Sequence, residues 1–196
     1  MVQLTHDFNR AQGLSDVFQE LLDAETNRYV KTVTDCSNKL TSLVKQKASL
    51  PEGQTEEINH SIEQEVRQLF KALRRMEQPA LGMDDTRKEN LAKHMKDLLS
   101  AVKSKEELEN FNSNEEIIRA FFRELNNQAN FKKLMDKVVE GISRQGAVEE
   151  KFKELVNVTQ SCTGDYTDAI TRSSKNDSLQ GAIIALVELF GSMLEH

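Results

Sequence analysis

The sequence contains no tryptophan, and proline, cysteine and glycine are all scarce, with 2 Pro, 2 Cys and 8 Gly in 196 residues. So few prolines and glycines leave little material for the many tight turns of a β-sandwich or β-barrel. Two cysteines cannot form the disulfide framework that holds small secreted domains together. A chain of this length can bury a hydrophobic core without such cross-links. We therefore expect a single domain over residues 1–193.

The chain also lacks a long apolar run and a basic segment. No run approaches the ~18 residues that cross a bilayer, and the first residues do not follow the pattern of a signal peptide. The net charge is −6 and no part of the chain is a basic arm, which excludes the electrostatic footprint of a general nucleic-acid-binding protein. These absences favour an intracellular location. Residues 194–196, Leu-Glu-His, resemble the start of a histidine tag, so the domain could be a fragment of a larger protein.

Helical periodicity dominates what is present. Apolar residues recur at spacings of three and four along most of the chain, and no segment shows the alternation of a half-buried strand. Two stretches have the spacing of a coiled-coil seam and predict long helices over residues 15–48 and 147–173. The first seam contains Leu22, Tyr29, Val33, Cys36, Leu40 and Leu43, and the second contains Val148, Phe152, Leu155, Thr159, Cys162, Tyr166 and Ile170. We predict an all-α, elongated antiparallel bundle of five to seven helices with no β-sheet.

Capping residues predict the ends of the shorter helices between these two. The four expected N-caps are Thr55, Asp84 or Asp85, Ser104 and Ser113, of which the last two have a glutamate three residues later and so the form of a capping box. An asparagine-rich stretch over 126–130 leaves two alternatives. We favour one kinked helix to about residue 143, because the apolar register continues across it, over two separate helices.

The last part of the chain contains its most apolar stretch. Residues 182–187 are apolar on nearly every side of a helix, so we expect them to be the most buried element. This final helix is expected over 179–193, with Ser178 as its cap and a loop over 173–177 before it.

The chemistry of known active sites is missing from the sequence. Glu57 and His60 form one Glu-x-x-His turn, whereas metal sites in helical bundles use two. Neither of the common glycine-rich phosphate loops is present. Cys36 and Cys162 occupy core positions of different predicted helices, so they are either small buried hydrophobes or the two halves of a disulfide. We therefore expect no catalytic, cofactor or metal site, and no small-molecule substrate.

One helix face combines an apolar stripe with basic residues and is the candidate interaction face. It lies within residues 66–76 and presents Arg67, Lys71, Arg74 and Arg75. Such a face could lie on an anionic membrane or in a partner's groove. The alternative is a solvated face near a helix C-terminus, where positive charge is favourable.

Long seams without catalytic groups indicate a non-enzymatic interaction module, a scaffold, adaptor or dimerisation domain that binds a protein partner or a second copy through a helix face. A membrane-acting toxin or effector domain is an alternative, using either the 66–76 face or residues 181–191, which are too few to span a bilayer.

A third function class comes from a resemblance. The segments that carry it are Phe18-Gln-Glu, Leu43-Val-Lys-Gln-Lys, Thr55-Glu-Glu-Ile and Ile62-Glu-Gln-Glu. With these, residues 18–77 resemble the N-terminal three-helix domain of syntaxins, which implies a regulatory bundle of the vesicle-traffic kind. We treat this as a similarity of composition.

Overall fold

The protein is described by a computed structural model that covers residues 24, 27–146, 148–160 and 169–194. Within these ranges it contains nine helices and no strand, which confirms the predicted all-α fold, whereas the expected number of five to seven helices is too low. The first is a helix over 27–48, named here the 27–48 helix. The others are α2 (Glu56–Arg74), α3 (Glu77–Leu81), α4 (Asp85–Leu99), α5 (Lys105–Glu109), α6 (Asn114–Leu125), α7 (Gln128–Gln145), α8 (Glu149–Gln160) and α9 (Ala169–Leu194).

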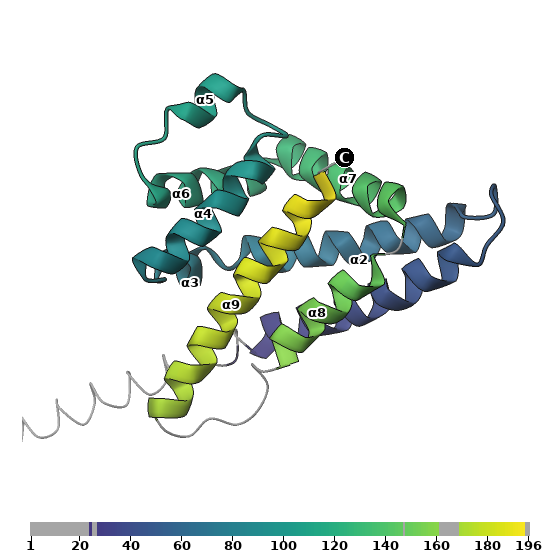
Figure 1. The fold of residues 1–196 in the computed structure, drawn as a ribbon, viewed down its shortest axis with the longest axis horizontal. Coiled ribbons are helices and arrows are strands. Elements are labelled where there is room, and N and C mark those ends of the chain that lie inside the picture. The colour runs from purple at the N-terminus through teal and green to yellow at the C-terminus, as the bar shows by residue number, and fades with distance from the viewer. Residues whose placement is uncertain (1–23, 25–26, 147, 161–168, 195–196) are drawn as a thin grey trace, which may run out of the picture.

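The helices are arranged around α9, which crosses the molecule diagonally (Figure 1). It packs against α4, α7 and α8, and α6 covers α4 from the other side. The 27–48 helix and α2 run antiparallel as a long hairpin, joined by a turn over residues 49–55 (Figure 1). This hairpin carries the candidate interaction face.

Most of the predicted caps are present. The Asp84 side chain accepts a hydrogen bond from the Arg87 backbone at 2.8 Å, and Ser104 forms a complete capping box with Glu107. Ser113 accepts from the Glu116 backbone at 3.1 Å. Its box is incomplete, because Glu116 Oε2 accepts from the backbone of Asn112, one residue before the cap, at 2.9 Å. Thr55 occupies the predicted N-cap position of α2, but its side chain makes no capping hydrogen bond.

The single kinked helix expected from residue 113 to about 143 is wrong. The structure has two helices, because α6 ends at Leu125 and α7 begins at Gln128. Asn127 supplies the break, since its Oδ1 accepts a hydrogen bond from the Asn130 backbone at 3.2 Å and caps α7. The apolar register continues across the turn only because both helices face the same core.

The second long helix is also divided. Residues 149–160 form α8, whereas Ile170 already lies in α9. The loop expected over 173–177 and its cap at Ser178 are wrong, because this stretch lies inside α9. Cys162 and Tyr166 of the predicted seam lie outside the described residues.

The core contains an aromatic stack that joins three helices. Phe70 of α2 and Phe190 of α9 stack with ring centroids 4.2 Å apart and planes 2° apart. Phe131 of α7 meets the edge of Phe70 at 5.9 Å. The expected burial of the apolar run in α9 is confirmed for Ala182, Ile183, Leu186 and Val187, which are fully enclosed, while Ile184 and Ala185 are partly buried.

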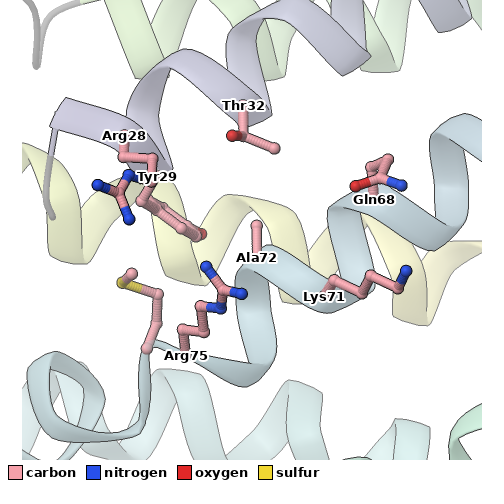
Figure 2. Close-up of a pocket in the computed structure, with 8 residues that line it drawn as sticks. Arg28, Tyr29, Thr32, Gln68, Lys71, Ala72 and Arg75 are labelled. Carbon is pink, nitrogen blue, oxygen red and sulfur yellow. The ribbon is translucent and has the colours of Figure 1, made fainter.

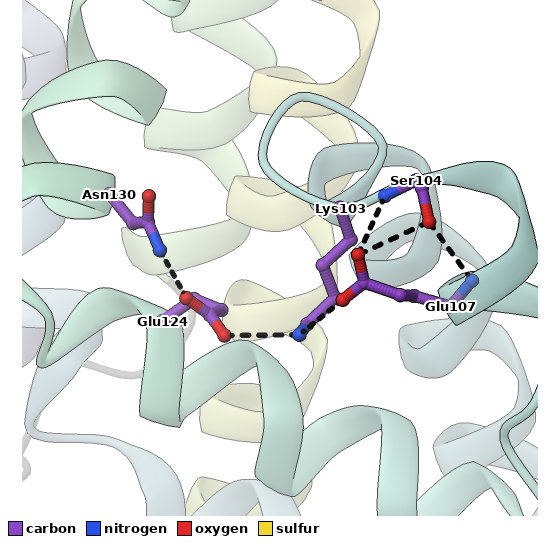
Figure 3. A network of polar contacts seen from close by, with 5 residues as sticks. All are labelled: Lys103, Ser104, Glu107, Glu124 and Asn130. Atoms are coloured by element: carbon purple, nitrogen blue, oxygen red, sulfur yellow. Dashed lines mark hydrogen bonds and ion pairs between the residues drawn. The ribbon is translucent and has the colours of Figure 1, made fainter.

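A polar network fixes the loop around α5 to the ends of α6 and α7 (Figure 3). Lys103 Nζ lies 3.5 Å from Glu107 and 3.2 Å from Glu124, and the Asn130 side chain donates a hydrogen bond to Glu124. The Ser104 backbone N–H, with smaller contributions from the Ser104 hydroxyl and Lys103, lowers the pKa of Glu107 below its usual value.

The apolar heptad face of the 27–48 helix packs against the rest of the molecule. Its heptad side chains Tyr29, Val33, Cys36 and Leu40 are buried, and at its end Val44 rather than Leu43 is the more deeply buried residue. Polar contacts hold the helix on both sides. Lys39 lies 3.8 Å from Glu65 of α2, and Thr34 donates a hydrogen bond to the Thr159 hydroxyl of α8 at 2.9 Å.

Candidate functional site

The four basic residues of the predicted interaction face divide into two pairs. Arg67 is half-buried and bonds Glu63 one turn away, with Nη2 3.4 Å from Oε1. The Arg74 guanidinium lies over the Phe131 ring, 5.1 Å from its centroid, where the π-electrons attract a cation. Both residues therefore serve contacts within the bundle. Lys71 of α2 and Arg75, the residue that caps the end of α2, are exposed.

Lys71 and Arg75 line a pocket between α2 and the start of the 27–48 helix (Figure 2). We call it the basic pocket. The 27–48 helix contributes Arg28, Tyr29 and Thr32, α2 contributes Gln68, Lys71 and Ala72, and Arg75 and Met76 directly follow α2. Figure 2 shows the Tyr29 side chain directed toward Arg75, with Arg28 on the other side of the ring and Lys71 extending along α2. The pocket thus has one cation on its first wall and two on its second.

Helical spacing explains how α2 makes its wall. Gln68, Lys71, Ala72 and Arg75 are separated by three or four residues and therefore share one face of the helix. Ala72 leaves room at the centre, because its side chain ends at Cβ where a longer one would fill the space. Across the pocket, Tyr29 is only 3% exposed, so its ring forms a fixed boundary.

The pocket is positively charged within a negatively charged protein. Arg28, Lys71 and Arg75 carry three positive charges, and no carboxylate is among the described lining residues. Within the described ranges these three cations form no ion pair, although several other basic residues do. Three unneutralised cations around a recess attract an anion from solution.

The size of the pocket limits what it can hold. Its volume is about 140 Å³, whereas sites for drug-sized ligands and cofactors occupy roughly 300–1,000 Å³. A nucleotide or a flavin does not fit, but a single side chain or a small anion does. The volume and the positive charge of the pocket are compatible with one small acidic group.

The other candidate groups from the sequence do not assemble into a reactive site in the described part of the chain. His60 is exposed, and no group of three potential metal ligands is found among the described residues. Cys36 carries a free, buried thiol whose pKa is raised to about 12, chiefly by burial and then by a hydrogen bond with Glu65. Cys162, its partner in the disulfide alternative, lies outside the described residues.

The apolar segment 181–191, which the sequence offered for membrane entry, forms part of the core. Ile183 and Phe190 are fully buried in it. None of the described helices is both long enough and apolar enough to cross a bilayer.

The sequence predicts two of the three cations of the basic pocket and misses the third. Lys71 and Arg75 belong to the predicted face, but Arg28 and Tyr29 come from another helix about 40 residues earlier. No local signal joins them to α2, because their proximity depends on how the two helices pack. Comparison with protein-family models, with curated proteins and with solved structures finds no match.

Proposed function

We propose that this chain is a non-enzymatic helical interaction module that binds an acidic segment of a partner protein in the basic pocket. The observation that carries the proposal is the group formed by Arg28, Lys71 and Arg75, which no carboxylate of the described lining neutralises. The protein as a whole has a charge of −6, so the positive charge of this pocket opposes the general repulsion of anions. Specific recognition of an acidic group is a use for such a local reversal of charge.

The scarcity of exposed apolar side chains in the described chain favours binding through charge over association through an apolar helix face. Among the described residues, Leu50 is the single large apolar side chain that is exposed, and it is only 38% accessible. The seams of the 27–48 helix and of α8 are occupied within the bundle, as Val33, Leu40, Phe152 and Leu155 show. An interface core normally needs clustered apolar or aromatic residues, so self-association has less to build on than docking of a charged segment.

Panning a random peptide library against the immobilised chain tests the proposal. We expect enrichment of peptides rich in Asp and Glu, and weaker binding as salt screens the attraction. The double variant Arg28→Gln/Arg75→Gln removes two charged hydrogen-bond donors, each worth roughly 1.5–3 kcal/mol, and should weaken an enriched peptide by at least about tenfold.

Arg123→Gln is the matched control, because Arg123 is exposed in the last turn of α6 and lies outside the pocket. It lowers the charge without touching the site and should leave binding unchanged. Enrichment of apolar peptides, or equal binding by the double variant, would contradict the proposal. A mass that doubles with concentration in light scattering, with no peptide bound, would favour the dimerisation alternative.

A further inference from the structure

The basic pocket holds more positive charge than one carboxylate can balance. From this we infer that its ligand is a phosphorylated side chain of the partner protein, with the phosphoryl group held by Arg28, Arg75 and Lys71. The inference rests on the proposed function, since it names the chemistry of the acidic group that the pocket takes. It adds a requirement for modification of the partner.

Charge is the first argument. The three cations of the pocket supply +3 with no opposing carboxylate in the described lining. An aspartate or glutamate side chain brings one negative charge, which leaves the cations repelling one another. A phosphoryl group brings about −1.5 to −2 and three acceptor oxygens, so it compensates the site more fully while remaining a single compact group.

The types of donor are the second argument. Two of the cations are arginines on opposite walls, and a guanidinium can donate two parallel hydrogen bonds to a phosphate. Arg28 and Arg75 are both exposed and lie on the two sides of the Tyr29 ring (Figure 2), so a ligand seated at the edge of this ring meets one guanidinium on each side. Thr32 and Gln68 add neutral hydrogen-bonding groups to the lining, one from each wall (Figure 2).

The size of the recess and the surface around it favour a protein side chain over a membrane lipid. A pocket of about 140 Å³ takes one phosphoryl group and its attachment. Stable adsorption to a membrane combines basic residues with apolar side chains that enter the bilayer. Leu50, the exposed large apolar residue of the described chain, lies at the opposite end of the 27–48 helix, some 30 Å from Arg28 at 1.5 Å per residue. The charge of −6 opposes approach to an anionic surface.

The test compares one peptide in two forms. An acidic peptide obtained by panning is synthesised with its key aspartate or glutamate either unchanged or replaced by phosphoserine, and both forms are titrated by fluorescence polarisation. We expect the phosphoserine form to bind at least about tenfold more tightly. The Arg28→Gln/Arg75→Gln variant should remove this advantage, and Arg123→Gln should retain it.

The pH dependence gives a second readout. The described lining contains no carboxylate and no histidine, and histidine is the side chain whose ordinary pKa lies between pH 5 and 8. The second pKa of a phosphate monoester is about 6. Lowering the pH from about 7.5 to about 5.5 should therefore weaken the phosphoserine peptide and leave the carboxylate peptide almost unchanged.

The outcomes separate the two proposals. If the acidic parent binds and the phosphoserine form binds no better, the phosphoryl inference fails while the proposed function stands. If no peptide binds, and O-phosphoserine and inorganic phosphate leave the arginine Nε–H resonances of the chain unmoved, both fail. Sedimentation with phosphatidylcholine vesicles that contain a phosphoinositide, lost in the Arg28→Gln/Arg75→Gln variant, would overturn the peptide ligand in favour of a lipid headgroup.

Discussion

The carbonyl oxygen of Met193 occupies the space beside Gly141 so closely that a Cβ atom on Gly141 would lie 2.0 Å from it. This is the point where α7 and α9 cross, and the same carbonyl accepts a hydrogen bond from Arg144 at 2.9 Å. Because the obstacle is backbone, it cannot turn aside as a side chain would. Only glycine therefore allows the two helices to approach to this distance.

Gly141→Ala should consequently destabilise the fold. The new methyl group forces α7 and α9 apart, and overpacking of this kind costs about 1–3 kcal/mol or more. We expect a loss of at least about 2 kcal/mol in urea unfolding followed by circular dichroism. Gly181→Ala is the matched control, because a Cβ on this α9 glycine meets nothing within 4 Å. It should raise stability by about 0.5–1 kcal/mol through helix propensity, and an equal loss in both variants would contradict the packing argument.

The stacked rings of Phe70 and Phe190 should be energetically coupled. Their centroids are 4.2 Å apart and both side chains are fully buried. Aromatic pairs contribute about 0.5–1.5 kcal/mol beyond the area that they bury. A double-mutant cycle of Phe70→Leu and Phe190→Leu, measured by urea unfolding, should return a coupling energy in this range. Phe70→Leu combined with Phe152→Leu should be additive, because no contact between these two rings is found within the described chain.

Removal of the Ser113 hydroxyl should weaken the start of α6. This side chain accepts a hydrogen bond from the Glu116 backbone at 3.1 Å, and loss of such a cap costs typically about 1 kcal/mol. Thr55→Ala provides the comparison, since Thr55 precedes α2 in the same way but makes no capping bond. We expect a clear loss of stability for Ser113→Ala and a smaller change for Thr55→Ala, and the reverse order would show that the caps are wrongly assigned.

The Cys36 thiol should be inert in the native protein. Burial, together with the hydrogen bond to Glu65, raises its pKa to about 12, and the thiolate is the reactive form. In a Cys162→Ser background, Ellman's reagent at about pH 8 should react far more slowly with the folded chain than with the unfolded chain. Rapid labelling of the folded protein would contradict the buried position.

The same shift sets the sign of a stability change at alkaline pH. The native state holds the Cys36 proton more tightly than the unfolded state, where the pKa is near its usual 9.0. The contribution of the protonated thiol is complete below about pH 9 and decreases as the pH rises toward 12. The free energy of unfolding should therefore fall more steeply with pH in the parent than in Cys36→Ala, and parallel curves would argue against the raised pKa.

The limits of the sequence can be seen at particular residues. Periodicity places Val66, Leu69 and Leu73 on the buried face of α2, and each is completely enclosed, because a helical stripe needs only local spacing. The division between α6 and α7 was missed, since the apolar register passes through Asn127 unbroken while the capping bond of that residue decides the turn. The spacing of apolar residues alone does not show whether a helix continues through an asparagine or ends at its cap.

The candidate site shows the same limit at longer range. Lys71 and Arg75 are neighbours on one helix face, so their grouping follows from sequence. Arg74 belongs to the same basic run, yet it is withdrawn from the site by Phe131 of α7. Arg28 joins the site only through the packing of two helices. Tertiary neighbours therefore decide which residues of a basic run are left to bind a ligand, and no local sequence pattern specifies those neighbours.

One wall of the basic pocket comes from the start of the 27–48 helix and the other from the end of α2. An anion bound there would therefore hold the two helices of the hairpin together. When the two helices separate on unfolding, the pocket is lost, and the ligand therefore binds only the folded protein. At a ligand concentration one hundred times its dissociation constant, such linkage adds about 2.7 kcal/mol to the resistance of the molecule to unfolding. A rise in the melting temperature can therefore reveal a ligand of the basic pocket before the partner protein is known.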